Sequence, residues 1–72
     1  MGVATFSYPD SLIGALRDDG VPPFGDSGEF DSFTDVMAHA RKLADKENMP
    51  IQYNWYGNKG TEYPEALRKR GY

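Results

Sequence analysis

The chain has 72 residues, no cysteine, one histidine and a net charge of −3 at pH 7, which excludes disulfides, thiolate metal sites and an imidazole-rich zinc site. No apolar run approaches the roughly eighteen residues that a membrane helix needs, and the first residues lack the basic and apolar segments of a signal peptide, so we expect a cytoplasmic protein with no membrane contact. We expect a single small globular domain over residues 1–72. A chain of this length buries only about 60% of its unfolded surface, so its core is marginal. Self-association to a homo-oligomer could complete that core.

The N-terminal part predicts a strand followed by a helix. Val3–Phe6 is short, β-branched and aromatic, as strands are. Ser7 and Asp10 have the spacing of a helix capping box, and Gly20 follows the last apolar position, where glycine commonly ends a helix. The apolar residues between them form one stripe: Leu12, Ile13 and Leu16. Gly14 lies inside this helix, and we expect a close neighbour to explain it.

A loop rich in proline and glycine is predicted over Val21–Gly28. Its last four residues, Gly25–Gly28, read Gly-Asp-Ser-Gly, which is similar to the short string around the nucleophile of trypsin-like serine proteases. That chemistry needs an oriented base and an oxyanion hole on a rigid scaffold, and four residues supply neither. We interpret them as a turn.

The clearest element is a second helix that begins at Ser32 and ends near Asn48, ahead of Pro50. Ser32 and Asp35 can form its cap. Its apolar residues repeat at helical spacing: Phe33, Val36, Met37, Ala40, Leu43 and Ala44. His39 lies one turn after Asp35, and we interpret it as a surface histidine beside a carboxylate, since no nucleophile has a recognisable spacing to it. We therefore predict a protein that is not an enzyme, with no catalytic residue, metal or cofactor.

Ile51–Tyr56 alternates as a half-buried strand does, with Ile51, Tyr53 and Trp55 on the core face and Tyr56 facing the other way. A turn over Gly57–Gly60 and a helix from Thr61 to Arg70 complete the chain. With a short additional strand at Phe30, the sequence predicts an α+β fold. We expect a sheet of two or three strands packed by two or three helices, in the order strand, helix, loop, helix, strand, helix.

Two five-residue segments repeat the pattern Tyr-Pro-acid-small-Leu, at Tyr8–Leu12 and Tyr63–Leu67. A proline and a carboxylate each favour the first turn of a helix. We interpret the repeat as two similar helix starts rather than a duplicated binding motif.

The charges are unevenly distributed along the chain. Residues 1–37 hold seven acidic residues against Arg17, whereas residues 38–72 hold seven basic residues against four acidic ones. We predict that the acidic half binds another protein with a basic surface, through Asp18, Asp19, Asp26, Glu29, Asp31 and Asp35. An aromatic and turn edge of Tyr56, Asn58 and Lys59 is predicted to contribute to the same binding.

Small, acidic, cysteine-free domains of this kind resemble the accessory inhibitors that phages and mobile elements make against host machinery, such as anti-CRISPR proteins. The resemblance is one of size and charge, and it implies an inhibitor or adaptor that acts on a nucleic-acid-handling host protein. The alternative is a single-stranded nucleic-acid-binding domain, with stacking rings and cationic side chains supplied by Tyr53, Trp55, Arg68, Lys69 and Arg70. The acidic composition makes that alternative the weaker of the two.

Overall fold

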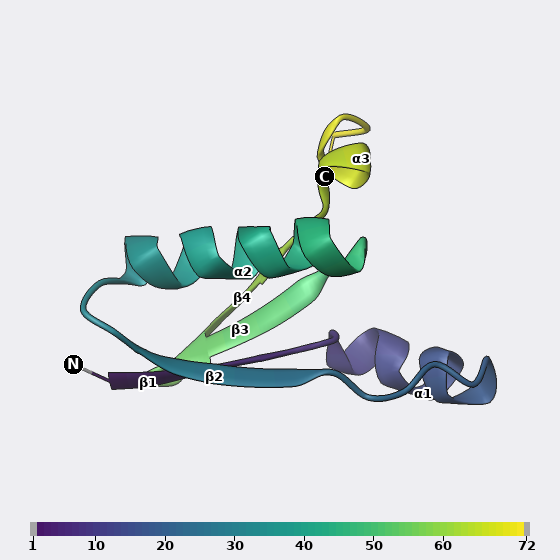
Figure 1. The fold of residues 1–72 in the computed structure, drawn as a ribbon, viewed down its shortest axis with the longest axis horizontal. Coiled ribbons are helices and arrows are strands. Elements are labelled where there is room, and N and C mark those ends of the chain that lie inside the picture. The colour runs from purple at the N-terminus through teal and green to yellow at the C-terminus, as the bar shows by residue number, and fades with distance from the viewer. Residues whose placement is uncertain (1, 72) are drawn as a thin grey trace.

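The computed structural model describes residues 2–71, and it places them in a four-stranded antiparallel sheet with three helices (Figure 1). The strands are β1 (Gly2–Ser7), β2 (Gly25–Phe30), β3 (Ile51–Trp55) and β4 (Asn58–Glu62), and the helices are α1 (Asp10–Asp18), α2 (Phe33–Glu47) and α3 (Glu65–Arg68). The strand order across the sheet is β2-β1-β3-β4. The predicted α+β class is confirmed, with more strand than the sequence indicated.

The segment Gly25–Gly28 is a strand, so the turn predicted there is wrong. It forms most of β2, which pairs with β1 over its full length, from Ser7 opposite Gly25 to Gly2 opposite Phe30. Local composition favours a turn, but the pairing with a distant strand satisfies the backbone hydrogen bonds of this segment and decides its conformation.

The turn and helix predicted after Tyr56 are also displaced. Tyr56 and Gly57 both have positive φ, at 52° and 78°, and they form a two-residue turn of the kind that matches the twist of a hairpin. Asn58–Glu62 therefore returns alongside β3 as β4. The helix begins only at Glu65, after Pro64.

The core lies between the sheet and α2, which covers one face of the sheet (Figure 1). The buried core residues come from β1, α2 and β3: Ala4, Phe6, Val36, Ala40, Ala44, Ile51 and Tyr53. The predicted stripe of α2 and the predicted core face of β3 are both confirmed. The side chain of Ser32 accepts a hydrogen bond from the backbone N–H of Asp35 at 3.2 Å, which confirms the predicted cap.

The opposite face of the sheet carries mainly hydroxyl and amide side chains. Alternation along the paired strands puts on it Val3, Thr5, Ser7, Ser27, Glu29, Gln52, Asn54, Lys59 and Thr61. In Figure 1, α1 extends beyond the end of β1 and α3 lies near the C-terminal end of α2, so neither helix lies over this face. None of the helices in residues 2–71 is long and apolar enough to cross a membrane.

The two Tyr-Pro segments start α1 and α3 in the same way, which confirms their interpretation as helix starts. Each helix follows a buried proline that has no capping side chain of its own. A side chain from another element accepts a hydrogen bond from the first backbone N–H instead. Gln52 Oε1 accepts from the N–H of Asp10 at 3.1 Å, and Asp45 Oδ1 accepts from the N–H of Glu65 at 2.9 Å. The capping box predicted between Ser7 and Asp10 does not form, because Pro9 occupies the N-cap position.

Candidate functional site

The six predicted acidic residues are all exposed, and they lie in or directly after edge strand β2, at the end of α1 and in the first turn of α2. β2 is one edge of the sheet and β4 is the other, so the acidic strand is separated from Lys59 on β4 by the width of the sheet, whereas Lys46 on α2 is close enough to help lower the pKa of Asp26. We call the following set the acidic edge: Asp18, Asp19, Asp26, Glu29, Asp31 and Asp35.

The acidic edge is a strip rather than a compact patch. Asp26 lies near the start of β2 and Asp31 directly follows its end, and a rise of about 3.3 Å per residue separates them by roughly 17 Å. Asp18 and Asp19, at the end of α1, extend the strip at the Asp26 end. Asp35, in the first turn of α2, extends it at the other end.

Most of the acidic edge has no counter-charge. Among residues 2–71, only Asp26 of this set forms an ion pair, with His39 at 3.1 Å. Unpaired carboxylates on one side of a small domain produce a negative potential there. The acidic edge therefore has the electrostatic character that the sequence predicted for a partner-binding surface.

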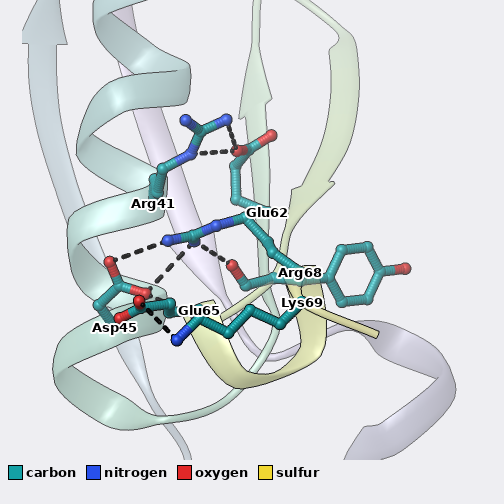
Figure 2. A network of polar contacts seen from close by, with 7 residues as sticks. Arg41, Asp45, Glu62, Glu65, Arg68 and Lys69 are labelled. Carbon is teal, nitrogen blue, oxygen red and sulfur yellow. Dashed lines mark hydrogen bonds and ion pairs between the residues drawn. The ribbon is translucent and has the colours of Figure 1, made fainter. Parts of the chain in front are cut away.

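Three of the seven basic residues after residue 37 form ion pairs that connect neighbouring elements (Figure 2). Arg41 lies 3.1 Å from Glu62, and Arg68 lies 3.3 Å from Asp45. Lys69 pairs with Glu65 across one turn of α3 at 3.3 Å. These contacts join α2, β4 and α3, so Arg41 and Arg68 contribute to the fold.

Asp45 is the centre of that network. It accepts hydrogen bonds from the Arg68 guanidinium and from the backbone N–H of Glu65. The hydrogen bond from Arg68 is the main reason that the pKa of the Asp45 carboxyl lies below its usual value, and the backbone N–H of Glu65 acts in the same direction. Arg68 also donates to the backbone carbonyl of Tyr63. This arrangement fixes α3 against α2.

His39 is paired with Asp26. The helical spacing indicates Asp35 instead, and that pair does not form. The His39 ring lies 4.8 Å from that of Phe6 and 5.3 Å from that of Phe30, which places Nε2 beside the Asp26 carboxylate at 3.1 Å. The hydrogen bond to His39 lowers the pKa of Asp26, with a further contribution from the backbone N–H of Ser27. The pair links edge strand β2 to α2.

Ser27 does not lie beside the Asp26–His39 pair and cannot serve it as a nucleophile. Successive residues of a strand point to opposite faces of the sheet. Asp26 faces α2 and His39, so Ser27 lies on the other face, opposite Thr5. The likeness of Gly25–Gly28 to a protease string therefore has no counterpart in the geometry.

Tyr56 is exposed as predicted, at 66%, but its ring lies on the same face as Trp55. The ring centroids of Trp55 and Tyr56 are 4.8 Å apart, and the Tyr56 ring covers Gly2 so closely that a Cβ there would collide with it. The cause is the positive φ of Tyr56, which takes it out of the strand alternation. Gly2 pairs with Phe30, so Tyr56 lies at the Asp31 end of the acidic edge.

Asn58 and Lys59 are exposed beside this turn, at the start of β4. The structure therefore places the predicted aromatic and turn edge at the same end of the sheet as Asp31 and Asp35. Asp18 and Asp19 lie at the other end, beyond the start of β2.

The residues of the nucleic-acid alternative do not share one surface. Tyr53 is only 5% exposed and packs against Phe33 with centroids 5.5 Å apart, and its burial, together with Glu62, raises the pKa of its phenol. Trp55 is half-buried, and its Nε1–H donates to the carbonyl of Gly2 at 3.2 Å.

The basic members of that alternative lie elsewhere. Arg68 is held by Asp45 on α2, and α3 follows the end of β4 that pairs with Ile51. Trp55 is at the opposite end of β3, about 13 Å away along the strand. Lys69 is paired with Glu65, whereas Arg70 is exposed and forms no ion pair with residues 2–71.

A pocket that the sequence did not predict lies between α1 and the segment that leads into β2. Its volume is about 220 Å³, and its lining is mainly apolar, with Tyr8, Ile13, Leu16, Val21, Pro22 and Phe24 among the contributors. The rings of Tyr8 and Phe24, which both line it, lie 5.5 Å apart. The lining comes from the end of β1, from α1 and from Val21–Phe24, which are brought together by the pairing of β1 with β2 and by the hydrogen bond from Val21 N–H to the Leu16 carbonyl.

No three histidine or acidic side chains among the described residues converge to hold a metal ion. Comparisons of the chain with protein-family models, with curated protein sequences and with solved structures each gave no match.

Proposed function

We propose that this protein is a non-catalytic protein-binding domain that docks a basic surface of another protein against its acidic edge. The observation that supports this most directly is the asymmetry of pairing. Five of the six carboxylates of the acidic edge lack an ion pair among residues 2–71, while three of the seven basic residues after residue 37 are paired with an acid, namely Arg41, Arg68 and Lys69. Complementary charge of this kind speeds association and selects partners.

Tyr56 gives the surface an aromatic contact residue at one end. An exposed tyrosine offers a large rigid area with a hydrogen-bonding tip, which is typical of interfaces. Its φ of 52° is in the left-handed region, which is unfavourable for a bulky residue. Asparagine or glycine would adopt the same turn without strain. Local strain kept at an exposed position is a recognised feature of functional sites.

A domain of this kind acts by occupying a surface of its partner, as an inhibitor or an adaptor. A basic surface is what proteins that handle nucleic acids present to the phosphate backbone. The proposal therefore favours a nucleic-acid-handling protein as the partner, with the acidic edge competing for the surface that otherwise binds nucleic acid.

The test is capture of partners from a cell lysate by the tagged protein after nuclease treatment, followed by measurement of binding to the purified partner. An acidic-edge variant removes three negative charges: Asp18→Asn, Glu29→Gln and Asp31→Asn. A control variant changes the net charge by the same amount on the α3 side: Glu47→Lys and Ala66→Lys. Circular dichroism establishes that both variants are folded.

We expect a protein partner that resists nuclease, is lost with the acidic-edge variant and is retained by the control. Binding to the purified partner should also weaken as salt is raised. Equal capture by both variants would overturn the proposal. Capture that disappears with nuclease would overturn it in favour of nucleic-acid binding.

A further inference from the structure

We infer that the pocket between α1 and Val21–Phe24 receives one apolar side chain of the partner, presented on a basic segment. The inference rests on the proposed function and names the chemistry of the partner at one end of the acidic edge. It follows from three properties of the pocket, namely its exposure, its size and the charges around it.

α1 contributes no buried residue to the domain, although it is amphipathic. Ile13 is 41% exposed, and Leu16 is only half-buried. The helix is held to the sheet by the hydrogen bond from Asp10 to Gln52, and its C-terminal end is closed by the bond from Val21 N–H to the Leu16 carbonyl at 2.9 Å. The apolar side of α1 is thus held open in a fixed position.

The volume of the pocket suits a side chain better than a free metabolite. Small-molecule sites usually enclose about 300–1,000 Å³, whereas this pocket holds about 220 Å³. An apolar cavity of about 150 Å³ is enough for a benzene ring. One leucine, methionine, phenylalanine or tryptophan side chain would therefore occupy it.

The charges around the pocket specify the residues that flank that side chain. Asp10 lies one turn before Ile13, and Asp18 and Asp19 end the same helix. All three carboxylates are exposed and form no ion pair with the described residues. Arg17 is the one charged residue that lines the pocket itself. Lysine or arginine on both sides of an apolar anchor is the complementary arrangement.

Gly14 is consistent with a close approach of the partner. A Cβ added to it would have no neighbour within 4 Å, and the residue is exposed. Nothing within the described part of the domain packs against it, contrary to the sequence-based expectation. A glycine next to Ile13 leaves room for a partner backbone against the helix.

The experiment is an NMR titration of the ¹⁵N-labelled protein with three synthetic nine-residue peptides. One has a central leucine flanked by arginines, the second replaces the leucine by serine, and the third replaces the arginines by glutamates. We expect shifts in the amides of α1 and Val21–Phe24 with the first peptide, and at least tenfold weaker binding of the other two.

Variants locate the contact. Ile13→Glu and the milder Ile13→Ala are expected to weaken binding of the arginine–leucine peptide, the first by tenfold or more. Val3→Glu, on the far face of the sheet where Val3 is 58% exposed, should leave it unchanged. Because no residue of α1 is buried, unchanged amide shifts in α2 and β3 show that the variants are folded.

Equal binding of the peptide to Ile13→Glu and wild type, or shifts confined to other elements, would overturn the inference. The same variant separates this result from the wider proposal. A lysate partner that is retained by Ile13→Glu but lost with the acidic-edge variant leaves the protein-binding function standing and removes the pocket from it. Loss of the partner with both variants supports both proposals.

Discussion

The carboxylate of Asp45, on α2, accepts a hydrogen bond from the backbone N–H of Glu65 at 2.9 Å, so one helix caps the start of another. α3 has only four residues and cannot be stable alone, because in so short a helix the few hydrogen bonds formed do not offset the free-energy cost of nucleation. Arg68, near the end of α3, binds the same carboxylate. Both ends of α3 therefore depend on one side chain of its neighbour.

Asp45→Ala should release α3 while leaving the core intact. The substitution removes the cap and the partner of Arg68 together, and Asp45 is itself exposed. We expect hydrogen exchange of the amides of Glu65–Lys69 to accelerate at least tenfold, with exchange in β1 and β3 unchanged. Lys69→Ala is the control, because it breaks only the exposed pair with Glu65. Unaltered exchange in the Asp45 variant would show that the cap does not hold the helix.

Gly60→Ala and Gly25→Ala should change stability in opposite directions. A Cβ on Gly60 would collide with the phenol of Tyr53, which cannot move aside because Phe33 covers it. Overpacking of this kind costs about 1–3 kcal/mol. At Gly25 the added Cβ meets nothing within 4 Å, and the loss of glycine flexibility contributes about 0.5 kcal/mol of stability. Urea unfolding of both variants measures the difference, and a stable Gly60 variant would contradict the packing described for Tyr53.

The same glycines show why half of the sheet could not be predicted. α2 and β3 bury one face each, so the periodicity of their apolar residues identifies them, as with Val36 and Ile51. β2 and β4 are edge strands with few apolar side chains, and their glycines at positions 25, 28 and 60 favour a turn in any local reading. Their pairing depends on partners far away in the sequence, which local propensity does not contain.

The candidate site divides in the same way. The separation of acidic and basic halves can be counted in the sequence, but the position of the acidic strand at one edge of the sheet, with Lys59 on the other edge strand, follows from the strand order β2-β1-β3-β4. The partner of His39 does not follow from the sequence, because the composition of β2 indicates a loop and the nearest carboxylate along the helix is that of Asp35. The orientation of Tyr56 depends on a positive φ, for which the sequence signal was Gly57 directly after it.

Acid should destabilise the protein partly through Asp26. Its pKa is lowered from the usual 3.8 by the hydrogen bond to His39, so the folded state favours the ionised carboxylate. The stability that this contributes is present above about pH 3.8 and is lost as the pH falls through the lowered value in the folded state. Asp45, whose pKa is lowered as well, acts in the same range.

The free energy of unfolding of the wild type, measured by urea titration, should therefore fall as the pH is lowered below about 4. Asp26→Asn should make this fall shallower, since the amide cannot ionise. Glu29→Gln is the matched control on the same strand, because Glu29 faces the other side of the sheet and has no ion pair with residues 2–71. A free energy of unfolding of Asp26→Asn that depends on pH as strongly as that of the wild type would show that the Asp26–His39 pair does not contribute to acid stability.

Gly14→Ala should stabilise α1 and at the same time weaken the interaction that we assign to it. Alanine is favoured over glycine inside a helix by about 1 kcal/mol, and the added Cβ meets no atom within 4 Å. Native-state hydrogen exchange should show the opening of α1 becoming less favourable by about that amount.

If a partner backbone lies against Gly14, the same methyl group should reduce binding of the arginine–leucine peptide. Ala15→Gly is the reciprocal control, because Ala15 is exposed on the same helix and outside the pocket lining. It should loosen α1 without adding an obstacle. Tighter peptide binding by Gly14→Ala would show that the added methyl group stabilises α1 and does not obstruct the peptide. Gly14 would then not be a contact position.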